Sequence, residues 1–325
     1  MSFTSSSAAA NGAPAEVLLV GPLLPSLVAA IESRHRVHRL WEAADPEHFA
    51  RTEARHSRAI VTSGRFGASR ALIESLPALE AIVSFGVGVD AIDLEAARAR
   101  GVTVTNTPQV LDECVADTAL ALMLAVSRRI VAADRFVRES RWARESFGLG
   151  RKVSGKRCGV AGLGNIGLEV ARRAEAFGMA ISYFNRRPRP DVPAHYTYCA
   201  DIATLARNAD FLVLCVPGGA QTRHLVDAEV LRAMPAQACL INVARGSVVD
   251  EAALVAALQS GHLAAAGLDV YEHEPHPPAA LLALEQTVLL PHIASATEET
   301  RQAMADLMLA NLTSWFERGV AVTPV

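Results

Sequence analysis

The chain has 325 residues, of which 51% are hydrophobic and 20% are charged. This length and composition suit one large domain or two medium-sized domains with a buried core, and they exclude a disordered, collagen-like or disulfide-stapled protein. With 31 basic against 34 acidic residues, the net charge is -3. A protein that binds nucleic acid or a membrane surface should carry an excess of basic residues, so we expect neither partner.

Neither the cysteines nor the N-terminus indicates secretion or metal binding. The 5 cysteines are odd in number and form no CxxC pair, so we predict neither a disulfide framework nor a zinc site. Residues 1–15 are rich in Ser and Ala and lack the charged start and apolar stretch of a secretory signal, which predicts a flexible tail. No run approaches the ~18 apolar residues of a membrane span. We therefore expect a soluble, cytoplasmic protein without a metal ion.

Strand-like runs alternate with helical patterns in the first third of the chain. The predicted strands are Val17–Val20, Val37–Trp41, Ala59–Thr62, Ala81–Phe85 and Val102–Thr105. This alternation is typical of βαβ units and a parallel sheet. A single long helix is predicted next, from about Leu111 to Glu139, and its apolar stretch Ala119–Val126 indicates burial.

A second alternating series fills the rest of the chain. Its predicted strands are Arg157–Ala161, Ala180–Phe184, Phe211–Val216, Ala238–Val243, Ala264–Val270 and Thr287–Leu290. A last helix is predicted at Glu298–Arg318. The two series predict an α/β protein with two parallel sheets.

The first strand of the second series runs directly into a glycine-rich loop. The loop reads Gly162-Leu163-Gly164-Asn165-Ile166-Gly167, and a helical pattern follows at once. In a dinucleotide-binding loop the first glycine allows the tight turn, the second lets the backbone approach the pyrophosphate, and the third lets the helix pack closely on the strand. The position between a strand and a helix favours this interpretation over a ligand-free glycine turn.

The next strand ends in a basic turn, Asn185-Arg186-Arg187. Enzymes that use NAD place an acidic residue there for the ribose hydroxyls. A carboxylate would repel the 2′-phosphate of NADP, whereas arginines would pair with it. The turn therefore favours NADP over NAD, the alternative being a solvated surface turn.

Three ionisable residues stand near the ends of late strands: Arg245, Glu274 and His292. Singly, each can be read as a surface charge, a loop residue or an ordinary histidine. In an open parallel sheet, however, ligands bind at the carboxyl ends of the strands, where the three can converge. Reduction of a 2-keto acid needs a cation for the carboxylate and a proton donor for the nascent alkoxide, which an arginine and a histidine supply. A carboxylate beside the imidazole would favour its charged form.

Long stretches of the chain resemble the D-isomer-specific 2-hydroxyacid dehydrogenase family. The segments that carry the resemblance are FGVGVDAIDLEAARARGVTVTNTP, GLGNIGLEVARRAEAFG, INVARGSVVDEAAL, GLDVYEHEP and LLPHIASATEETRQAM. Within the family, ISYFNRRPRP, VADTALALMLAVSRRI and the closing TPV are most similar to NADPH-dependent glyoxylate/hydroxypyruvate reductases, including those that reduce hydroxyphenylpyruvate.

The resemblance implies roles for individual residues. Arg245 would bind substrate, Glu274 would pair with the histidine, and His292 would act as acid and base. Backbone N–H groups of Val87 and Gly88 would bind the substrate carboxylate. Asp269 would lie in the cofactor site near the nicotinamide, and further cofactor contacts are expected at Val216, Pro217, Thr222, Val243, Ala244, Arg245 and His292.

The resemblance also implies an architecture. A Rossmann-like dinucleotide domain at 108–292 would be inserted into a discontinuous, flavodoxin-like substrate domain made of 16–107 and 293–325. The family is typically dimeric through the long helix region, where Trp142 would reach the partner's pocket; a core position for this tryptophan is the alternative.

Two alternative functions remain open at this stage. One is a D-lactate- or phosphoglycerate-type dehydrogenase. The other is a dinucleotide-sensing, corepressor-like protein without turnover, which would be expected to favour NAD(H). The main departure from the relatives that use NAD is Asn185, where they carry an acid, and it puts NAD use in doubt rather than family membership.

Overall fold

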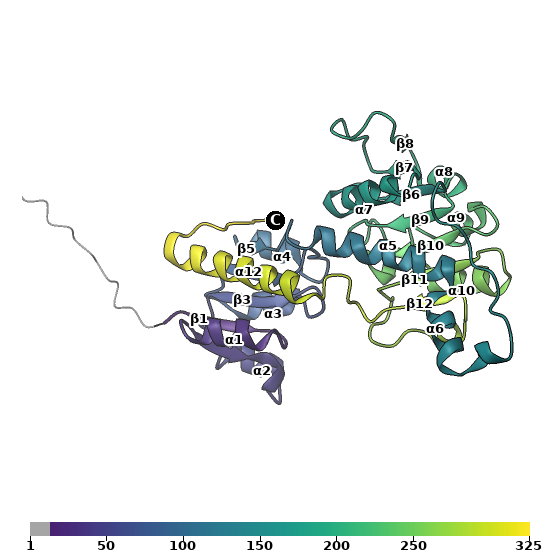
Figure 1. The fold of residues 1–325 in the computed structure, drawn as a ribbon. Coiled ribbons are helices and arrows are strands. Elements are labelled where there is room, and N and C mark those ends of the chain that lie inside the picture. Colours follow the sequence, from purple (N-terminus) through teal and green to yellow (C-terminus); the bar gives the residue numbers. More distant parts are fainter. Residues whose placement is uncertain (1–13) are drawn as a thin grey trace, which may run out of the picture. The chain divides into compact units, whose positions relative to one another are not determined.

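The computed structural model describes residues 14–325, so most of the predicted tail lies outside the described residues. The chain divides into two compact units, which Figure 1 colours along the sequence. The first contains the described residues up to Pro108 together with Gln302–Val325, and the second contains Gln109–Arg301. The chain thus leaves the first unit once and returns to it after the second.

The first unit is built on a five-stranded parallel sheet. The strands lie in the order β2-β1-β3-β4-β5, so the chain order reverses between β1 and β3. This is the flavodoxin-like order, as predicted. The strands are β1 (Glu16–Leu19), β2 (Arg36–Arg39), β3 (Ala59–Ser63), β4 (Ala81–Phe85) and β5 (Thr103–Thr105). The connecting helices are α1 (Pro25–Glu32), α2 (Pro46–Arg51), α3 (Arg70–Ser75) and α4 (Leu94–Ala99).

The last helix, α12 (Glu298–Arg318), has the predicted bounds, and most of it belongs to the first unit. The indole of Trp315 donates to Glu80 at 3.2 Å. After the helix, the side chain of Asn311 accepts hydrogen bonds from the backbone of Val322 and Thr323. These contacts fix the C-terminal segment against the sheet. Neither α12 nor any other helix within residues 14–325 is long and apolar enough to cross a membrane.

The second unit contains a seven-stranded parallel sheet in the order β12-β11-β10-β9-β6-β7-β8. Counted from its own first strand, this is the Rossmann order with one added edge strand. The strands are β6 (Arg157–Ala161), β7 (Ala180–Phe184), β8 (Thr197–Cys199), β9 (Phe211–Leu214), β10 (Cys239–Asn242), β11 (Ala265–Leu268) and β12 (Thr287–Leu289). The helices that follow the glycine loop are α7 (Asn165–Ala176), α8 (Ile202–Arg207), α9 (Ala228–Ala233), α10 (Glu251–Gln259) and α11 (Ala279–Leu282). The two parallel-sheet α/β units confirm the predicted fold class.

The prediction of one helix over 111–139 is wrong. The structure has α5 (Asp112–Arg128) and α6 (Ile130–Arg138), and Arg129 between them takes the left-handed conformation with φ of 54°. Arginine favours helices and no glycine or proline marks the break, so the local sequence gives little sign of it. The apolar stretch of α5 is buried as expected: a Cβ on Gly267 of β11 would lie 2.9 Å from the Cβ of Leu122.

Candidate active site

The predicted site residues of the second unit follow six neighbouring strands at the same edge of the sheet. The glycine loop follows β6, the basic turn follows β7, and Val216 and Pro217 follow β9. Val243–Arg245 follow β10, Asp269 follows β11 and His292 follows β12. Since all pairs in this sheet are parallel, these residues share the carboxyl edge, and the chain order reverses between β6 and β9. A crevice at such a reversal is where open α/β sheets bind ligands.

The three glycines of the loop differ in how closely other atoms surround them. Gly162 has φ of +92°, and a Cβ there would approach the backbone N of Val216 to 2.8 Å. A Cβ on Gly167 would lie 2.0 Å from the carbonyl oxygen of Gly162. Nothing lies within 4 Å of a Cβ built on Gly164, which is exposed. The first and third glycines are therefore required by the fold, while the second leaves the backbone open to a ligand.

Helix α7 begins directly at this open glycine. Its N-cap is Gly164, no side chain caps it, and its first turn contains no acidic residue. Helix N-termini carry unpaired N–H groups and a partial positive charge, which suit an anion. The loop and the helix start thus fit the pyrophosphate of a dinucleotide.

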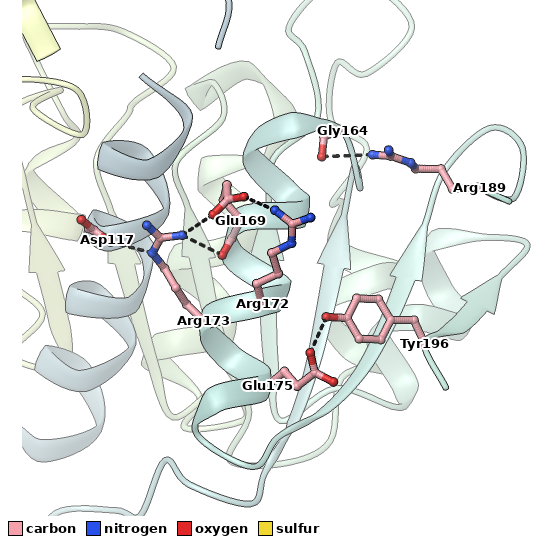
Figure 2. A network of polar contacts seen from close by, with 8 residues as sticks. All are labelled: Asp117, Gly164, Glu169, Arg172, Arg173, Glu175, Arg189 and Tyr196. Atoms are coloured by element: carbon pink, nitrogen blue, oxygen red, sulfur yellow. Dashed lines mark hydrogen bonds and ion pairs between the residues drawn. The ribbon is translucent and has the colours of Figure 1, made fainter. Parts of the chain in front are cut away.

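Ion pairs hold α7 in place behind the loop (Figure 2). The guanidinium of Arg173 donates to Asp117 on α5 at 2.6 Å and to Glu169 within α7 at 2.6 Å. Arg172 donates to the same Glu169. The network joins α5 to α7, so the helix that carries the phosphate-binding end is fixed from the side.

The basic turn is attached to the glycine loop by Asn185. Its Oδ1 accepts the backbone N–H of Leu163 at 2.7 Å, and its carbonyl oxygen accepts the hydroxyl of Tyr198 at 3.3 Å. Arg186 and Arg187 are both exposed, and Arg186 lies 3.5 Å from the side-chain oxygen of Gln221. Two arginines are thus presented beside the loop, where an acid would stand in an NAD enzyme.

The predicted acid/base pair is present. Nδ1 of His292 lies 2.8 Å from Oε2 of Glu274. Burial acts to raise the pKa of Glu274. The hydrogen bond and charge of His292, the N–H of Tyr271 and the charge of Arg245 together bring this pKa below its usual value. Glu274 also accepts the backbone N–H of Tyr271 at 3.2 Å. Because Nδ1 faces the carboxylate, Nε2 of this exposed histidine is left for a ligand.

Asp269 shapes the backbone around His292. Its carboxylate accepts the N–H groups of Ile293 and Ala294 at 2.7 and 2.8 Å. Its carbonyl oxygen accepts the N–H of His292, whose φ is 56°. Burial raises the pKa of this carboxyl above its ordinary value, although both backbone hydrogen bonds act against the shift. Asp269 therefore lies at the carboxyl edge of the sheet and supports the backbone around the histidine.

Arg245 stands at the end of the turn after β10. Asn242 holds this turn, accepting from the N–H of Ala244 and donating to the carbonyl of Arg245, both at 3.0 Å. The next residue, Gly246, is packed so closely that a Cβ would lie 1.8 Å from the carbonyl carbon of Tyr271. The turn with Arg245 and the segment leading to Glu274 are thus in direct contact.

The remaining predicted residues are less informative. The hydroxyl of Thr222 donates to the carbonyl of Pro217 at 2.7 Å, which closes the loop after β9. Val87 and Gly88 lie after β4 in the first unit, where Asn106 donates to the carbonyl of Val87 at 2.9 Å. Trp142 is 71% exposed, so the alternative of a core tryptophan is wrong.

Sequence reasoning missed three contributors to the site. Glu272 pairs with Arg223 and lies 3.0 Å from His224, which ties the loop with Thr222 to the segment before Glu274. Gly246 was not singled out, and Arg189 was not assigned a role. Of these three residues, only Arg189 carried a signal in the sequence, since it lies two residues after the basic turn.

Comparison with known proteins identifies the family of the chain. The model for the D-isomer specific 2-hydroxyacid dehydrogenase NAD-binding domain matches residues 120–294. The chain belongs to the D-isomer-specific 2-hydroxyacid dehydrogenase family. Family membership confirms the resemblance drawn from the sequence motifs.

Similar members of the family match over nearly the whole chain. Glyoxylate/hydroxypyruvate reductase A of Arabidopsis thaliana and hydroxyphenylpyruvate reductase of Plectranthus scutellarioides are each 45% identical to it, covering 95% of this chain and 98% of their own. Among solved structures, an NADPH-dependent glyoxylate/hydroxypyruvate reductase of Sinorhizobium meliloti, in complex with NADP and malonate, superimposes with a TM-score of 0.91 at 43% identity. That match covers 96% of this chain and 97% of the other.

Proposed function

We propose that this family member reduces a small 2-keto acid, of the glyoxylate or hydroxypyruvate type, to the D-2-hydroxy acid with NADPH. The observation that carries the proposal is the His292–Glu274 pair, 2.8 Å apart at the carboxyl edge of the sheet that holds the glycine loop. The similarity to reductases of these substrates supports the substrate class. The basic turn and the NADPH-dependent structural relative support the cofactor.

The proposal assigns roles to His292, Glu274 and Arg245. NADPH, when bound, supplies the hydride. His292 gives its Nε2 proton to the former carbonyl oxygen, while Glu274 on Nδ1 orients the ring and stabilises its protonated form. Arg245 binds the substrate carboxylate through its planar fork of donors and polarises the carbonyl. The N–H groups of Val87 and Gly88 remain predicted partners of the same carboxylate.

The predicted cofactor-binding residues all lie in the second unit. We assign dinucleotide binding to residues 109–301, supported by the family match over 120–294. The two segments of the other unit then carry the substrate domain. The chain divides into units after Pro108 and after Arg301, whereas the predicted domain boundaries fall after residues 107 and 292.

The proposal is tested by following NADPH absorbance after addition of glyoxylate, hydroxypyruvate and hydroxyphenylpyruvate. We expect oxidation of NADPH and a product of D configuration. A D-lactate- or phosphoglycerate-type enzyme would instead prefer NADH and its own keto acid. A dinucleotide sensor would bind nucleotide and show no turnover with any keto acid, which would overturn the proposal.

We further propose a homodimer formed through the region after α5. This stretch exposes a group of large apolar side chains: Ile130, Val131, Val137, Trp142 and Leu149. Exposed apolar patches mark interaction sites, and a second copy of the chain is the partner that the family resemblance implies. Light scattering should give a dimer, and Val137→Asp with Trp142→Ala should give a monomer. The cytoplasmic location and the lack of nucleic-acid binding stay predictions.

A further inference from the structure

A third arginine, Arg189, follows the basic turn by two residues, and its side chain is directed toward the glycine loop. Nη1 of Arg189 donates to the carbonyl oxygen of Leu163 at 2.8 Å. The same nitrogen lies 3.5 Å from the carbonyl oxygen of Gly164 (Figure 2). Its side chain is 24% exposed, whereas Arg186 and Arg187 are exposed residues. Arg189 therefore differs in environment from the two arginines that precede it.

The other nitrogen atoms of Arg189 also form hydrogen bonds. Nε donates to Oδ1 of Asp191 at 2.8 Å, and Nη2 pairs with the other oxygen of that carboxylate. Its backbone N–H donates to the hydroxyl of Tyr183 on β7 at 3.1 Å. Prolines at 188 and 190 restrict the backbone on both sides. A phosphate placed on this guanidinium would also meet the negative charge of Asp191, which argues against Arg189 as a direct phosphate ligand.

Both backbone groups of Leu163 are bound by the segment that follows β7. Asn185 accepts its N–H at 2.7 Å, and Arg189 donates to its carbonyl at 2.8 Å. The stretch between these two anchors contains Arg186 and Arg187. The stretch from Asn185 to Arg189, which includes the basic turn, is thus attached to the glycine loop at both of its ends.

We propose that Arg189 is a positioning residue for the cofactor, which fastens the turn carrying Arg186 and Arg187 to the carbonyls of Leu163 and Gly164. This inference rests on the proposed function, because it concerns how the dinucleotide site is shaped. The guanidinium also offsets the negative ends of two carbonyl dipoles beside the place where an anionic pyrophosphate would bind. Loss of Arg189 should therefore weaken both NADPH and NADH, in contrast to loss of a 2′-phosphate ligand.

The test compares Arg189→Ala with wild type by calorimetric titration of NADPH and NADH. We expect the dissociation constants of both nucleotides to rise by about tenfold or more, since hydrogen bonds from a charged donor are worth roughly 1.5–3 kcal/mol. Arg36→Ala removes an exposed arginine of the first unit that pairs with Glu16, and it should leave both constants near wild type. A loss confined to NADPH would make Arg189 a phosphate ligand, and no loss would make it a plain surface ion pair. Either result would overturn the inference.

A second measurement uses the protein without nucleotide. Hydrogen exchange of the amides of residues 163–168 and 185–191 should be faster in Arg189→Ala, and Arg189→Lys, which keeps charge but not the fork, should exchange at an intermediate rate. Unchanged exchange in both variants would overturn the fastening role. If wild type bound neither nucleotide, the proposed function would fail, while this comparison would still decide the role of Arg189.

Discussion

At the scale of single residues, the site depends on which nitrogen of His292 is occupied. Glu274 faces Nδ1, and the backbone around the ring is held by Asp269 through two N–H groups. The histidine is thus fixed from its own chain segment and from the loop after β11. This leaves one defined ring nitrogen for proton transfer.

Removal of the imidazole should stop proton transfer without disturbing the nucleotide site. We expect His292→Ala to lower kcat for keto-acid reduction by on the order of 10²–10⁴, the usual contribution of a general acid. The NADPH dissociation constant should stay near wild type. His195→Ala is the matched control, because His195 forms another exposed pair with a glutamate, Glu175. Equal kinetics for His292→Ala and the control would remove His292 from the mechanism.

The role of Glu274 should appear in the pH profile. Its pKa is lowered by the hydrogen bond and charge of His292 against the effect of burial, so the carboxylate stays ionised at neutral pH. Glu274→Gln removes this charge, so the protonated imidazole loses its partner. The pH above which reduction declines should therefore fall. Glu175→Gln removes a glutamate that pairs with another histidine, His195, and it should not move this pH. Superimposable profiles for wild type and Glu274→Gln would refute the pairing role.

Residue types in sequence were enough to predict that His292 and Glu274 lie together and that a glycine loop joins β6 to α7, because their spacing relative to strands is itself the signal. Arg189 and Gly246 were not predictable in the same way. The reach of Arg189 to Leu163 depends on how the turn folds back. The demand on Gly246 comes from Tyr271, which follows a different strand.

At the scale of secondary-structure elements, the active-site loops are joined by backbone contact. Gly246 is the point where the turn after β10 meets the segment after β11. Gly246→Ala should push these loops apart, lowering the free energy of unfolding by roughly 1–3 kcal/mol. It should also lower kcat/KM, because Arg245 and Glu274 lie on either side of the contact.

Thermal unfolding and steady-state kinetics of Gly246→Ala check this. Gly148→Ala is the control, since its Cβ would meet the flexible end of Arg129 at 3.1 Å. A Gly246→Ala protein as stable and active as this control would show that the two loops move independently.

The start of the nucleotide sheet depends on one carboxylate. Asp210 accepts the N–H of Arg157 at 2.9 Å and its Nη2 at 2.9 Å, which links the beginnings of β6 and β9. The hydrogen bonds and charge of Arg157 lower the pKa of Asp210, although burial acts against them. A carboxyl with a lowered folded-state pKa stabilises the fold above its unfolded-state pKa, and this stabilisation is lost as pH falls through the folded-state value.

Asp210→Asn should therefore lower the free energy of unfolding by about 1 kcal/mol at neutral pH. The difference from wild type should shrink as the pH is lowered below about 4, the ordinary pKa of an aspartate, because the unfolded wild-type chain then gains its proton before the folded one. Denaturant titrations at several pH values measure it. A difference that stayed constant down to acid pH would contradict this link.

The sequence predicted most elements because apolar strand runs between helical patterns are distinctive. Strands β6 and β7 and helix α12 have the predicted bounds. Strand β8 was missed, since Thr197–Cys199 is a three-residue edge strand with only its last residue buried. The break at Arg129 was missed because no residue type in that stretch disfavours a helix.

At the scale of the whole molecule, two parallel-sheet units of one chain divide the work. The unit of residues 109–301 contains the glycine loop, the basic turn and the His292–Glu274 pair together. In the proposed function, cofactor choice and proton transfer are therefore properties of one continuous stretch of sequence. The substrate domain remains the role predicted for the first unit.

The ratio of kcat/KM for NADPH to that for NADH, measured with hydroxypyruvate, tests this division most directly. One charged hydrogen bond to the 2′-phosphate favours NADPH by roughly 10- to 150-fold, so wild type should show at least a tenfold preference. The triple variant Asn185→Asp, Arg186→Ala, Arg187→Ala should lose this preference and keep its choice of keto acid. Raised salt should weaken NADPH binding more in wild type than in the variant. Equal use of both cofactors by wild type would contradict the assignment of the basic turn, and no oxidation of either would contradict the activity itself.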